Sequence, residues 1–367
     1  MGNILADEDD VHVLDLPQLY TKPPATTILE ALDLLKIEPQ TWQQNPPKAA
    51  LSRHRLERNE EVPAYLTRII SSSLLWIENG EAKEQIWEVA SKRLSERSGR
   101  TGMGSFDRHF NIPLRTDALQ GAKQKSQPSE ANGMTGGLHD KGTVVLELHE
   151  PTLTGDNLGL KTWASSHLLA RRLCSLRENE NFPKFDQEEI VLELGSGTGL
   201  VGLAAAAVFR TQTFLTDLPE IVPNLRKNAE ANAQVIKDRG GSVDCGVLDW
   251  TNPSAFTPPN QRSRSSPNNF PLILAADPIY SPEHPSLLAN AVAYHLAHVD
   301  DARLVIELPI REAYGPERQN LRERLSVIGL RLSDEGEETG VDDWIGQDGE
   351  LAEIKCWWSV WSWRKHW

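Results

Sequence analysis

Ile190-Val191-Leu192-Glu193-Leu194-Gly195-Ser196-Gly197-Thr198-Gly199 is the most informative stretch of the chain. Its first five residues are apolar apart from Glu193 and begin with the β-branched Ile190 and Val191, a run that is typical of a buried strand. The alternating glycines that follow are typical of a tight turn in which the backbone approaches a ligand closely. The apolar run from Leu200 to Phe209 then predicts a helix. A strand, a glycine turn and a helix in this order indicate an α/β fold that binds a nucleotide-like cofactor at the carboxyl end of the strand.

Strands and helices alternate from Thr143 to the end of the chain. We predict strands at 144–148, 190–194, 213–217, 243–247, 272–277, 302–308, 330–332 and 354–363. We predict helices at 162–176, 200–209, 221–236, 287–298 and 315–328. The acidic run from Asp334 to Asp343 is predicted to be a solvated loop between the last two strands, with contact to a basic protein substrate as the alternative. Alternation of this length predicts an open, mostly parallel sheet with helices on both sides.

The rest of the chain differs from this α/β part in composition. Residues 1–97 carry apolar side chains at helical spacing, notably in 27–36, 62–76 and 84–94, and predict an N-terminal helical extension. Residues 98–142 are rich in Gly, Ser, Gln, Pro and Asn, which predicts a flexible linker. Within that linker, residues 106–114 are a candidate for a short docked piece. Residues 143–367 then form the α/β domain.

The composition argues against several classes of function. With 52 acidic and 38 basic residues the formal net charge is −14, and so acidic a chain is a poor binder of phosphate backbones. Cys174, Cys245 and Cys356 form neither a metal-ligand spacing nor a disulfide framework, and we expect no metal. No apolar run approaches the roughly 20 residues that span a bilayer, and the acidic N-terminus resembles no targeting signal. We therefore expect a cytoplasmic monomer without nucleic-acid or membrane partners.

The glycine turn admits two interpretations. Gly197-x-Gly199-x-x-Gly202 matches the dinucleotide fingerprint, and Asp217 falls at the distance expected for a ribose ligand. This interpretation predicts an NAD-dependent oxidoreductase. The alternative reads the motif as Glu193-x-Gly195-x-Gly197-x-Gly199, with the acidic residue at the end of the strand.

Residues downstream of the turn distinguish the two interpretations. Asp249-Trp250 closes the third core strand, where a Trp offers a flat apolar face to a base. Ala276-Asp277-Pro278-Ile279-Tyr280 follows the fourth core strand, and an NAD enzyme needs nothing of that form there. A third motif, Glu150 to Trp163, contains Asp-Asn-Leu-Gly-Leu-Lys-Thr-Trp and lies between a predicted strand and a predicted helix.

With these motifs in this order, residues 144–363 resemble the seven-stranded protein-lysine methyltransferases that use S-adenosylmethionine, in the methyltransferase-like group whose post-strand signature is Asp-x-x-Tyr. The resemblance implies a Rossmann-like seven-stranded sheet, S-adenosylmethionine as the cofactor and a protein substrate. The helical extension and the Asp-Asn-Leu-Gly-Leu-Lys-Thr-Trp sequence of the third motif look most like those of the fungal enzymes that methylate a lysine of translation elongation factor 2. Related enzymes modify chaperones and other translation factors, which remain alternative substrates.

The resemblance also implies roles for individual residues. Asp277 and Tyr280 are the expected catalytic pair. Methyl transfer is an in-line displacement in which the amine must be aligned about 3 Å from the methyl carbon. A carboxylate can capture and orient the incoming ammonium, and a Tyr adds a wall and a hydroxyl. The expected cofactor-binding residues are Trp163, Glu193, Gly195, Ser196, Gly197, Asp217, Leu218, Asp249, Trp250 and Ala276.

Two further alternatives remain open at this point. Asp-Pro-Ile-Tyr is close to the Asp-Pro-Pro-Tyr pattern of enzymes that methylate an exocyclic amino group in nucleic acid. The second Pro is absent here, and the net charge of −14 argues against that substrate. A protein that kept the cofactor fold and only binds a partner is the other alternative. The tryptophans Trp357, Trp361 and Trp363 share one face of the predicted last strand and are expected to pack in the core or against helices, with a substrate-docking surface as the alternative.

Overall fold

A computed structural model of the chain describes residues 13–37, 61–97, 102, 104–121, 142–153, 158–185, 189–256, 269–345 and 351–364. The chain divides into two compact units. The first contains residues 1–105 together with the short segments 152–154 and 343–350, and the second contains the remainder.

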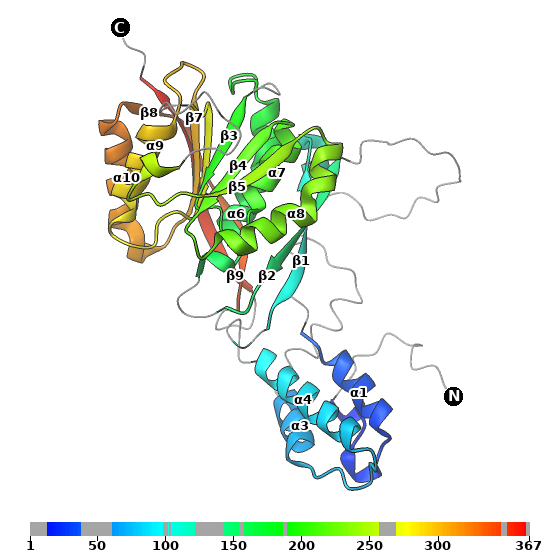
Figure 1. The fold of residues 1–367 in the computed structure, drawn as a ribbon. Coiled ribbons are helices and arrows are strands. Elements are labelled where there is room, and N and C mark those ends of the chain that lie inside the picture. The colour runs from blue at the N-terminus through cyan, green and yellow to red at the C-terminus, as the bar shows by residue number, and fades with distance from the viewer. Residues whose placement is uncertain are drawn as a thin grey trace, which may run out of the picture. The chain divides into compact units, whose positions relative to one another are not determined.

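The first unit is helical in its described residues. Its described α-helices are α1 (Ala25–Leu34), α3 (Glu61–Ser71) and α4 (Gly80–Glu96), with short 3-10 turns at Val13–Asp15 and Leu19–Thr21 (Figure 1). Asn79 begins α4 by accepting a hydrogen bond from the backbone N–H of Ala82, which satisfies one of the free donors of the first turn. Apolar side chains of all these elements form a core of their own. The unit can therefore bury an apolar interior from its own residues.

A seven-stranded sheet organises the second unit, in the order β5-β4-β3-β6-β7-β9-β8. The strands β3 to β7 pair in parallel, whereas β9 runs antiparallel to β7. This arrangement confirms the predicted Rossmann-like sheet. The bounds are β3 Ile190–Leu194, β4 Gln212–Asp217, β5 Ser242–Val247, β6 Leu272–Ala276, β7 Arg303–Pro309, β8 Leu330–Ile345 and β9 Leu351–Trp363.

Helices cover both faces of this sheet (Figure 1). On one face lie α6 (Ala164–Glu178), α7 (Leu200–Phe209) and α8 (Val222–Asp238), and on the other lie α9 (His284–His295) and α10 (Gly315–Val327). Every residue of α7 is buried, which explains why its sequence is apolar on all sides. The main core fills the space between the sheet and α9 and α10.

A separate two-stranded antiparallel sheet contains β1 (Phe106–Pro113) and β2 (Thr143–Glu150). The segment 106–114, predicted as a docked piece of a linker, is thus a strand, and the strand predicted at 144–148 pairs with it outside the large sheet. The side chains of Asn228 and Asn232 on α8 hydrogen-bond the backbone of β2 and hold this small sheet in place. Helix α5 (Thr116–Gly121) follows β1, and linker residues 122–141 lie outside the described residues.

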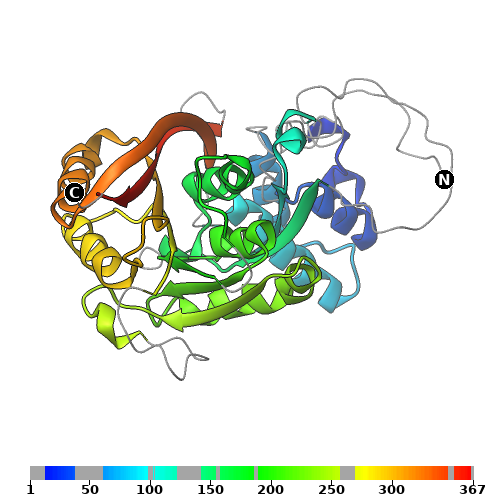
Figure 2. The ribbon, with the colours of Figure 1, turned by 90° about the horizontal axis from the view of Figure 1, so that it is seen from above.

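The prediction of a solvated loop at 334–343 is wrong, because these residues belong to β8. Figure 2 shows β8 and β9 as a long curved ribbon. Side-chain partners explain how an acidic run can form a strand here: Glu335 accepts a hydrogen bond from Trp357 Nε1 at 2.7 Å and pairs with Arg322. Trp357 and Trp361 are buried in the main core, which confirms their predicted role.

No helix among the described residues is long and apolar enough to cross a membrane. The three cysteines are free thiols. The described residues also contain no group of His, Cys, Asp and Glu that could hold a metal ion.

Candidate functional site

The glycine turn connects β3 to α7 and depends on backbone conformations that glycine adopts readily. Gly195, Gly197 and Gly199 have φ values of +71°, +56° and +94°, where a side chain would be strained. The backbone N–H groups of Gly195 and Ser196 both donate to the Thr216 carbonyl at 3.0 Å. Ser196 Oγ in turn accepts from the Thr216 N–H at 2.9 Å. The turn is thereby fixed to the end of the neighbouring strand β4.

The motif before the core packs directly on this turn. A Cβ at Gly197 would lie 2.8 Å from the carbonyl oxygen of Gly159, which belongs to the 3-10 turn Leu158–Leu160. The hydroxyls of Thr162 and Thr198 are 2.7 Å apart and connect the same two segments. Residues 154–157 of the motif lie outside the described residues. The motif ending at Trp163 and the glycine turn therefore form one structural element.

Glu193 lies beneath the turn with 2% of its surface exposed. Its Oε2 accepts a hydrogen bond from the backbone N–H of Gly202 at 2.9 Å, so the two residues that distinguished the alternative readings are bonded to each other. Burial raises the pKa of Glu193 to about 8, although hydrogen bonds from Ser196 and Gly202 oppose the shift. At neutral pH the group is mostly an uncharged carboxylic acid that supports the first turn of α7.

Asp217 ends β4 and faces the turn. Its Oδ2 accepts from the Gly197 N–H and its Oδ1 from the Leu218 N–H, both at 2.7 Å. Burial raises the pKa of Asp217, and these two backbone hydrogen bonds lower it. Each carboxylate oxygen has a second lone pair, so this side chain can still accept hydrogen bonds from a pair of hydroxyl groups.

Trp250 lies against the other side of the turn, whereas its neighbour Asp249 does not. The Trp250 ring is 3.2 Å from the position of a Cβ at Gly195, and its edge meets the ring of His284 with 6.0 Å between centroids. Asp249 is exposed and accepts a hydrogen bond from the Thr251 N–H at 2.8 Å. This hydrogen bond stabilises the turn that contains Trp250, so Asp249 acts in the described contacts by positioning Trp250.

Asp277 and Tyr280 follow β6 at the same edge of the sheet. Asp277 has a φ of +49°, unusual for a residue with a side chain, and its N–H donates to the Glu307 carbonyl at 2.9 Å. Burial raises the pKa of Asp277 to about 6. Tyr280 is 54% exposed, and its ring lies 4.1 Å from that of His284. Ala276, just before them, is buried.

Three charged residues that the sequence analysis missed surround Asp277. Arg311 Nη2 lies 3.6 Å from Asp277 Oδ2, and the Arg311 guanidinium is 5.3 Å from the centre of the Trp163 ring. Lys161 Nζ is 4.2 Å from the same ring centre and forms a buried ion pair with Asp342 of β8. Arg311 follows the carboxyl end of β7, and that position is the signal that could have identified it.

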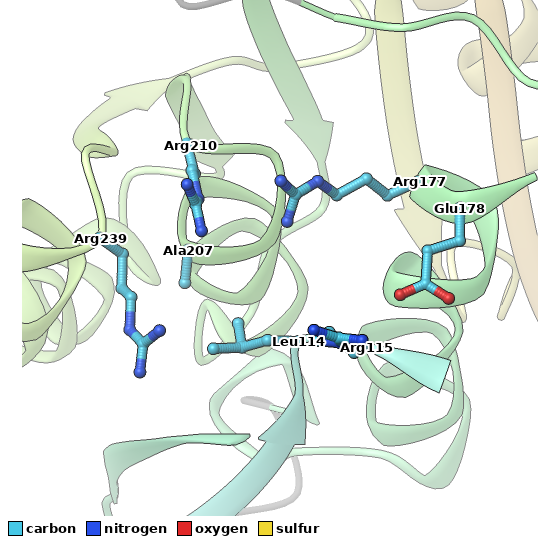
Figure 3. A pocket seen from close by; sticks show the side chains of 7 residues that line it. All are labelled: Leu114, Arg115, Arg177, Glu178, Ala207, Arg210 and Arg239. Carbon is cyan, nitrogen blue, oxygen red and sulfur yellow. The ribbon is translucent and has the colours of Figure 1, made fainter. Parts of the chain in front are cut away.

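The predicted site residues that follow strands thus lie at the carboxyl ends of β3, β4, β5 and β6, where ligands bind in open α/β sheets. A cavity of about 310 Å³ is found elsewhere, lined by Leu114, Arg115, Arg177, Glu178, Ala207, Arg210 and Arg239. Figure 3 shows its arginine side chains. Arg210 and Arg239 cap the C-terminal ends of α7 and α8, where cations interact favourably with the free carbonyl groups. None of the predicted site residues lines this cavity.

Comparison with known proteins places the chain among enzymes. The family model described as lysine methyltransferase matches residues 141–313, a range that contains Trp163, the glycine turn, Asp277, Tyr280 and Arg311. The protein-lysine N-methyltransferase rrg1 of Schizosaccharomyces pombe is 30% identical over 95% of this chain and 97% of that protein. The protein-lysine N-methyltransferase EFM2 of Saccharomyces cerevisiae is 35% identical over 72% of this chain, and this match covers only 58% of the length of EFM2. The EEF1A lysine methyltransferase 3 of Mus musculus is 29% identical over 56% of this chain and 81% of that protein.

Proposed function

Because the chain belongs to the lysine methyltransferase family, whose members are enzymes, we propose that it transfers the methyl group of S-adenosylmethionine to a lysine side chain of a protein. The observation that carries this proposal is the position of Asp277. Asp277 directly follows the C-terminal end of β6, the strand that lies next to β3 and its glycine turn, and its carboxyl group is buried. Arg311 contacts both Asp277 and the Trp163 ring, and Tyr280 follows Asp277 by three residues. A carboxylate so placed can receive an ammonium group beside a bound nucleoside.

The residues around the glycine turn fit S-adenosylmethionine. Gly195 and Gly197 have no side chains, which lets the Trp250 ring and the Gly159 carbonyl pack against the turn, and the turn backbone would contact the amino-acid part of the cofactor. Asp217 would accept the ribose hydroxyls with its remaining lone pairs, and Trp250 would offer a flat face to the adenine. When bound, S-adenosylmethionine supplies an electrophilic methyl group on a sulfonium. Ser196 in the turn, Leu218 after Asp217 and Ala276 before Asp277 would contact the same cofactor.

Asp277 would bind the substrate lysine and orient it. A free lysine amine has a pKa near 10.4, so its neutral form at pH 7 lies roughly 4–5 kcal/mol above the ammonium in water. A carboxylate stabilises the ammonium, which assists capture but opposes loss of its proton. Asp277 is therefore a positioning and capturing group for the substrate, and the proton leaves to solvent. Tyr280, with its exposed ring, would form the wall along which the lysine side chain enters.

We further propose a cytoplasmic translation factor as the substrate, with elongation factor 2 as the first candidate, and a monomeric enzyme. The support is the resemblance of the helical extension and of the Asp-Asn-Leu-Gly-Leu-Lys-Thr-Trp motif to the fungal elongation factor 2 enzymes. The relative named for EEF1A supports the same class of substrate. The net charge of −14 favours a protein over a nucleic acid.

The proposal is tested by incubating the purified protein with labelled S-adenosylmethionine and a cytosolic extract. We expect label in protein that survives nuclease treatment, and loss of label with nuclease would favour the nucleic-acid alternative. Asp277→Ala should abolish transfer but keep binding of S-adenosylhomocysteine by calorimetry. Binding of NAD in place of S-adenosylhomocysteine would refute the cofactor assignment. Cofactor binding without transfer to any extract would favour the non-catalytic alternative.

A further inference from the structure

Arg311 is held at the edge of the candidate site by its backbone. It follows Ile310, whose N–H donates to the Lys355 carbonyl of β9 at 2.7 Å. The Arg311 carbonyl accepts from Arg318 Nη1 of α10 at 3.3 Å. A short 3-10 turn, Glu312–Tyr314, comes next and leads into α10. These bonds fix the Arg311 backbone between β9 and α10.

The Arg311 side chain reaches two proposed site residues at once. Its Nη2 lies 3.6 Å from Asp277 Oδ2, and its guanidinium is 5.3 Å from the centre of the Trp163 ring, within cation–π range. We propose that Arg311 is a positioning residue that keeps Asp277 ionised at neutral pH and occupies one of its two carboxylate oxygens, so that the other receives the substrate ammonium. This inference rests on the proposed role of Asp277.

The charges that face Asp277 single out Arg311. On the segment before α6, Lys161 is positive but forms a buried ion pair with Asp342 of β8. Asp342 itself raises the pKa of Asp277, and burial raises it more. The Cys356 thiol of β9 and the Tyr280 hydroxyl also face Asp277, and the pKa of each is raised, chiefly by burial, so both are neutral at pH 7. Arg311 is the group that most opposes the effect of burial on Asp277.

Arg311 also bears on the chemistry of the substrate. A carboxylate alone would raise the pKa of a captured lysine and hold it as an unreactive ammonium. The positive guanidinium on the other carboxylate oxygen offsets part of the negative charge that the lysine experiences. The carboxylate therefore orients the lysine while raising the pKa of its ammonium group by less. Loss of Arg311 should therefore raise the pKa of Asp277 and the pKa of the bound lysine, and both effects move activity to higher pH.

The chain offers a matched control. Arg322 on α10 is 36% exposed at its side chain, against 34% for Arg311. It pairs with the carboxylate of Glu335 and lies 4.4 Å from the centre of the Trp357 ring, so it has the same two kinds of partner. Neither Arg322 nor its partners belongs to the proposed catalytic or cofactor-binding set. Arg322→Gln thus removes an ion pair and a cation–π contact of the same kinds, with a more exposed carboxylate, away from the proposed site.

The first test is the pH dependence of kcat/KM for Arg311→Gln, Arg311→Lys and Arg322→Gln in the 367-residue chain, with unmethylated elongation factor 2 as the methyl acceptor. We expect Arg311→Gln to shift the acid limb upward by about one pH unit, the lower end of the effect of a neighbouring cation on a carboxyl. Arg311→Lys and Arg322→Gln should keep the wild-type profile. A uniform loss of activity at every pH in Arg311→Gln, or no change at all, would overturn the proposal.

A second test needs neither cofactor nor substrate. A higher pKa of Asp277 in the folded state destabilises the protein only at pH values at which this carboxyl group ionises. The loss of folding stability caused by Arg311→Gln should therefore grow as the pH rises. We expect its folding equilibrium constant, relative to wild type, to fall about tenfold between about pH 5 and pH 8 in urea unfolding. In an Asp277→Asn background this pH dependence should vanish. Its persistence there would show that Arg311 acts on another group. Absence of methylation by the wild-type protein would instead refute the proposed function and leave this unfolding result standing.

Discussion

Replacing Glu193 by Gln is expected to stabilise the protein at neutral pH, although Glu193 lies directly under the proposed cofactor site. The carboxyl group is buried, and burial raises its pKa to about 8, against a normal value of 4.5. Around pH 7 the unfolded chain therefore carries an ionised Glu193, whereas the folded protein keeps it protonated. A glutamine has the shape of that protonated acid and never ionises, and its Oε can still accept from the Gly202 N–H.

The magnitude follows from the two pKa values. The pKa of Glu193 is higher in the folded protein than in the unfolded chain. Wild type therefore loses stability as the pH rises from the unfolded-state pKa of Glu193 toward its folded-state pKa. The loss relative to Gln is about 1 kcal/mol at pH 5, about 3 kcal/mol at pH 7 and about 4 kcal/mol at pH 8. Glu193→Ala also avoids this loss but leaves the Gly202 N–H without its acceptor, so it should be less stable than Glu193→Gln by about 1–3 kcal/mol at every pH.

Urea unfolding of wild type, Glu193→Gln and Glu193→Ala between about pH 5 and pH 8 measures these differences. The reasoning is refuted if the advantage of Glu193→Gln does not grow with pH, or if the variant is less stable than wild type at pH 8. Binding of S-adenosylhomocysteine by calorimetry at pH 7 supplies a second readout. We expect Glu193→Gln to bind within a few-fold of wild type because the turn keeps its hydrogen bond to α7.

Two further predictions test the packing of the site, each with a second substitution for comparison. Gly197→Ala should destabilise the protein by about 1–2 kcal/mol for its φ of +56° alone, and should weaken S-adenosylhomocysteine binding because the new Cβ would displace the Gly159 carbonyl 2.8 Å away. Gly315→Ala, in open space at the start of a helix, should leave thermal unfolding and binding at wild-type levels or slightly better. Lys161→Met should lower stability by about 3–5 kcal/mol because it leaves the buried Asp342 carboxylate without its cation. In a double-mutant cycle Asp342→Leu should recover part of that loss, and strict additivity in thermal unfolding would show that the two residues act independently.

The sequence was sufficient for the architecture where the local signals were strong. The apolar strands and the glycine turn predicted the parallel sheet, and the carboxyl-end rule brought Asp217 and Asp277 to one edge of it. The acidic residues of β8 misled the prediction because charge suggests solvent, whereas Trp357 and Arg322 provide partners that allow Glu335 to lie in a strand. Such partners are distant in sequence and cannot be inferred from periodicity.

The charged residues around Asp277 were hidden for the same reason. Lys161 lay inside the motif quoted for Trp163, but only the fold shows that it is buried against Asp342, about 180 residues later. Arg311 carries no motif, and its importance comes from two contacts that only the fold shows, 3.6 Å to Asp277 Oδ2 and 5.3 Å to the centre of the Trp163 ring. The positive φ of Asp277 likewise depends on how the chain leaves β6, which composition does not encode.

Site-resolved mass spectrometry of a methyl acceptor tests the central proposal most directly. The wild-type protein and Asp277→Ala are each incubated with S-adenosylmethionine and unmethylated elongation factor 2 or cytosolic protein, and the methylated positions are mapped. We predict methyl groups on a lysine side chain with wild type and none with Asp277→Ala, while both proteins bind S-adenosylhomocysteine. Methylation of another chemical group, or equal lysine methylation by Asp277→Ala, would contradict the account.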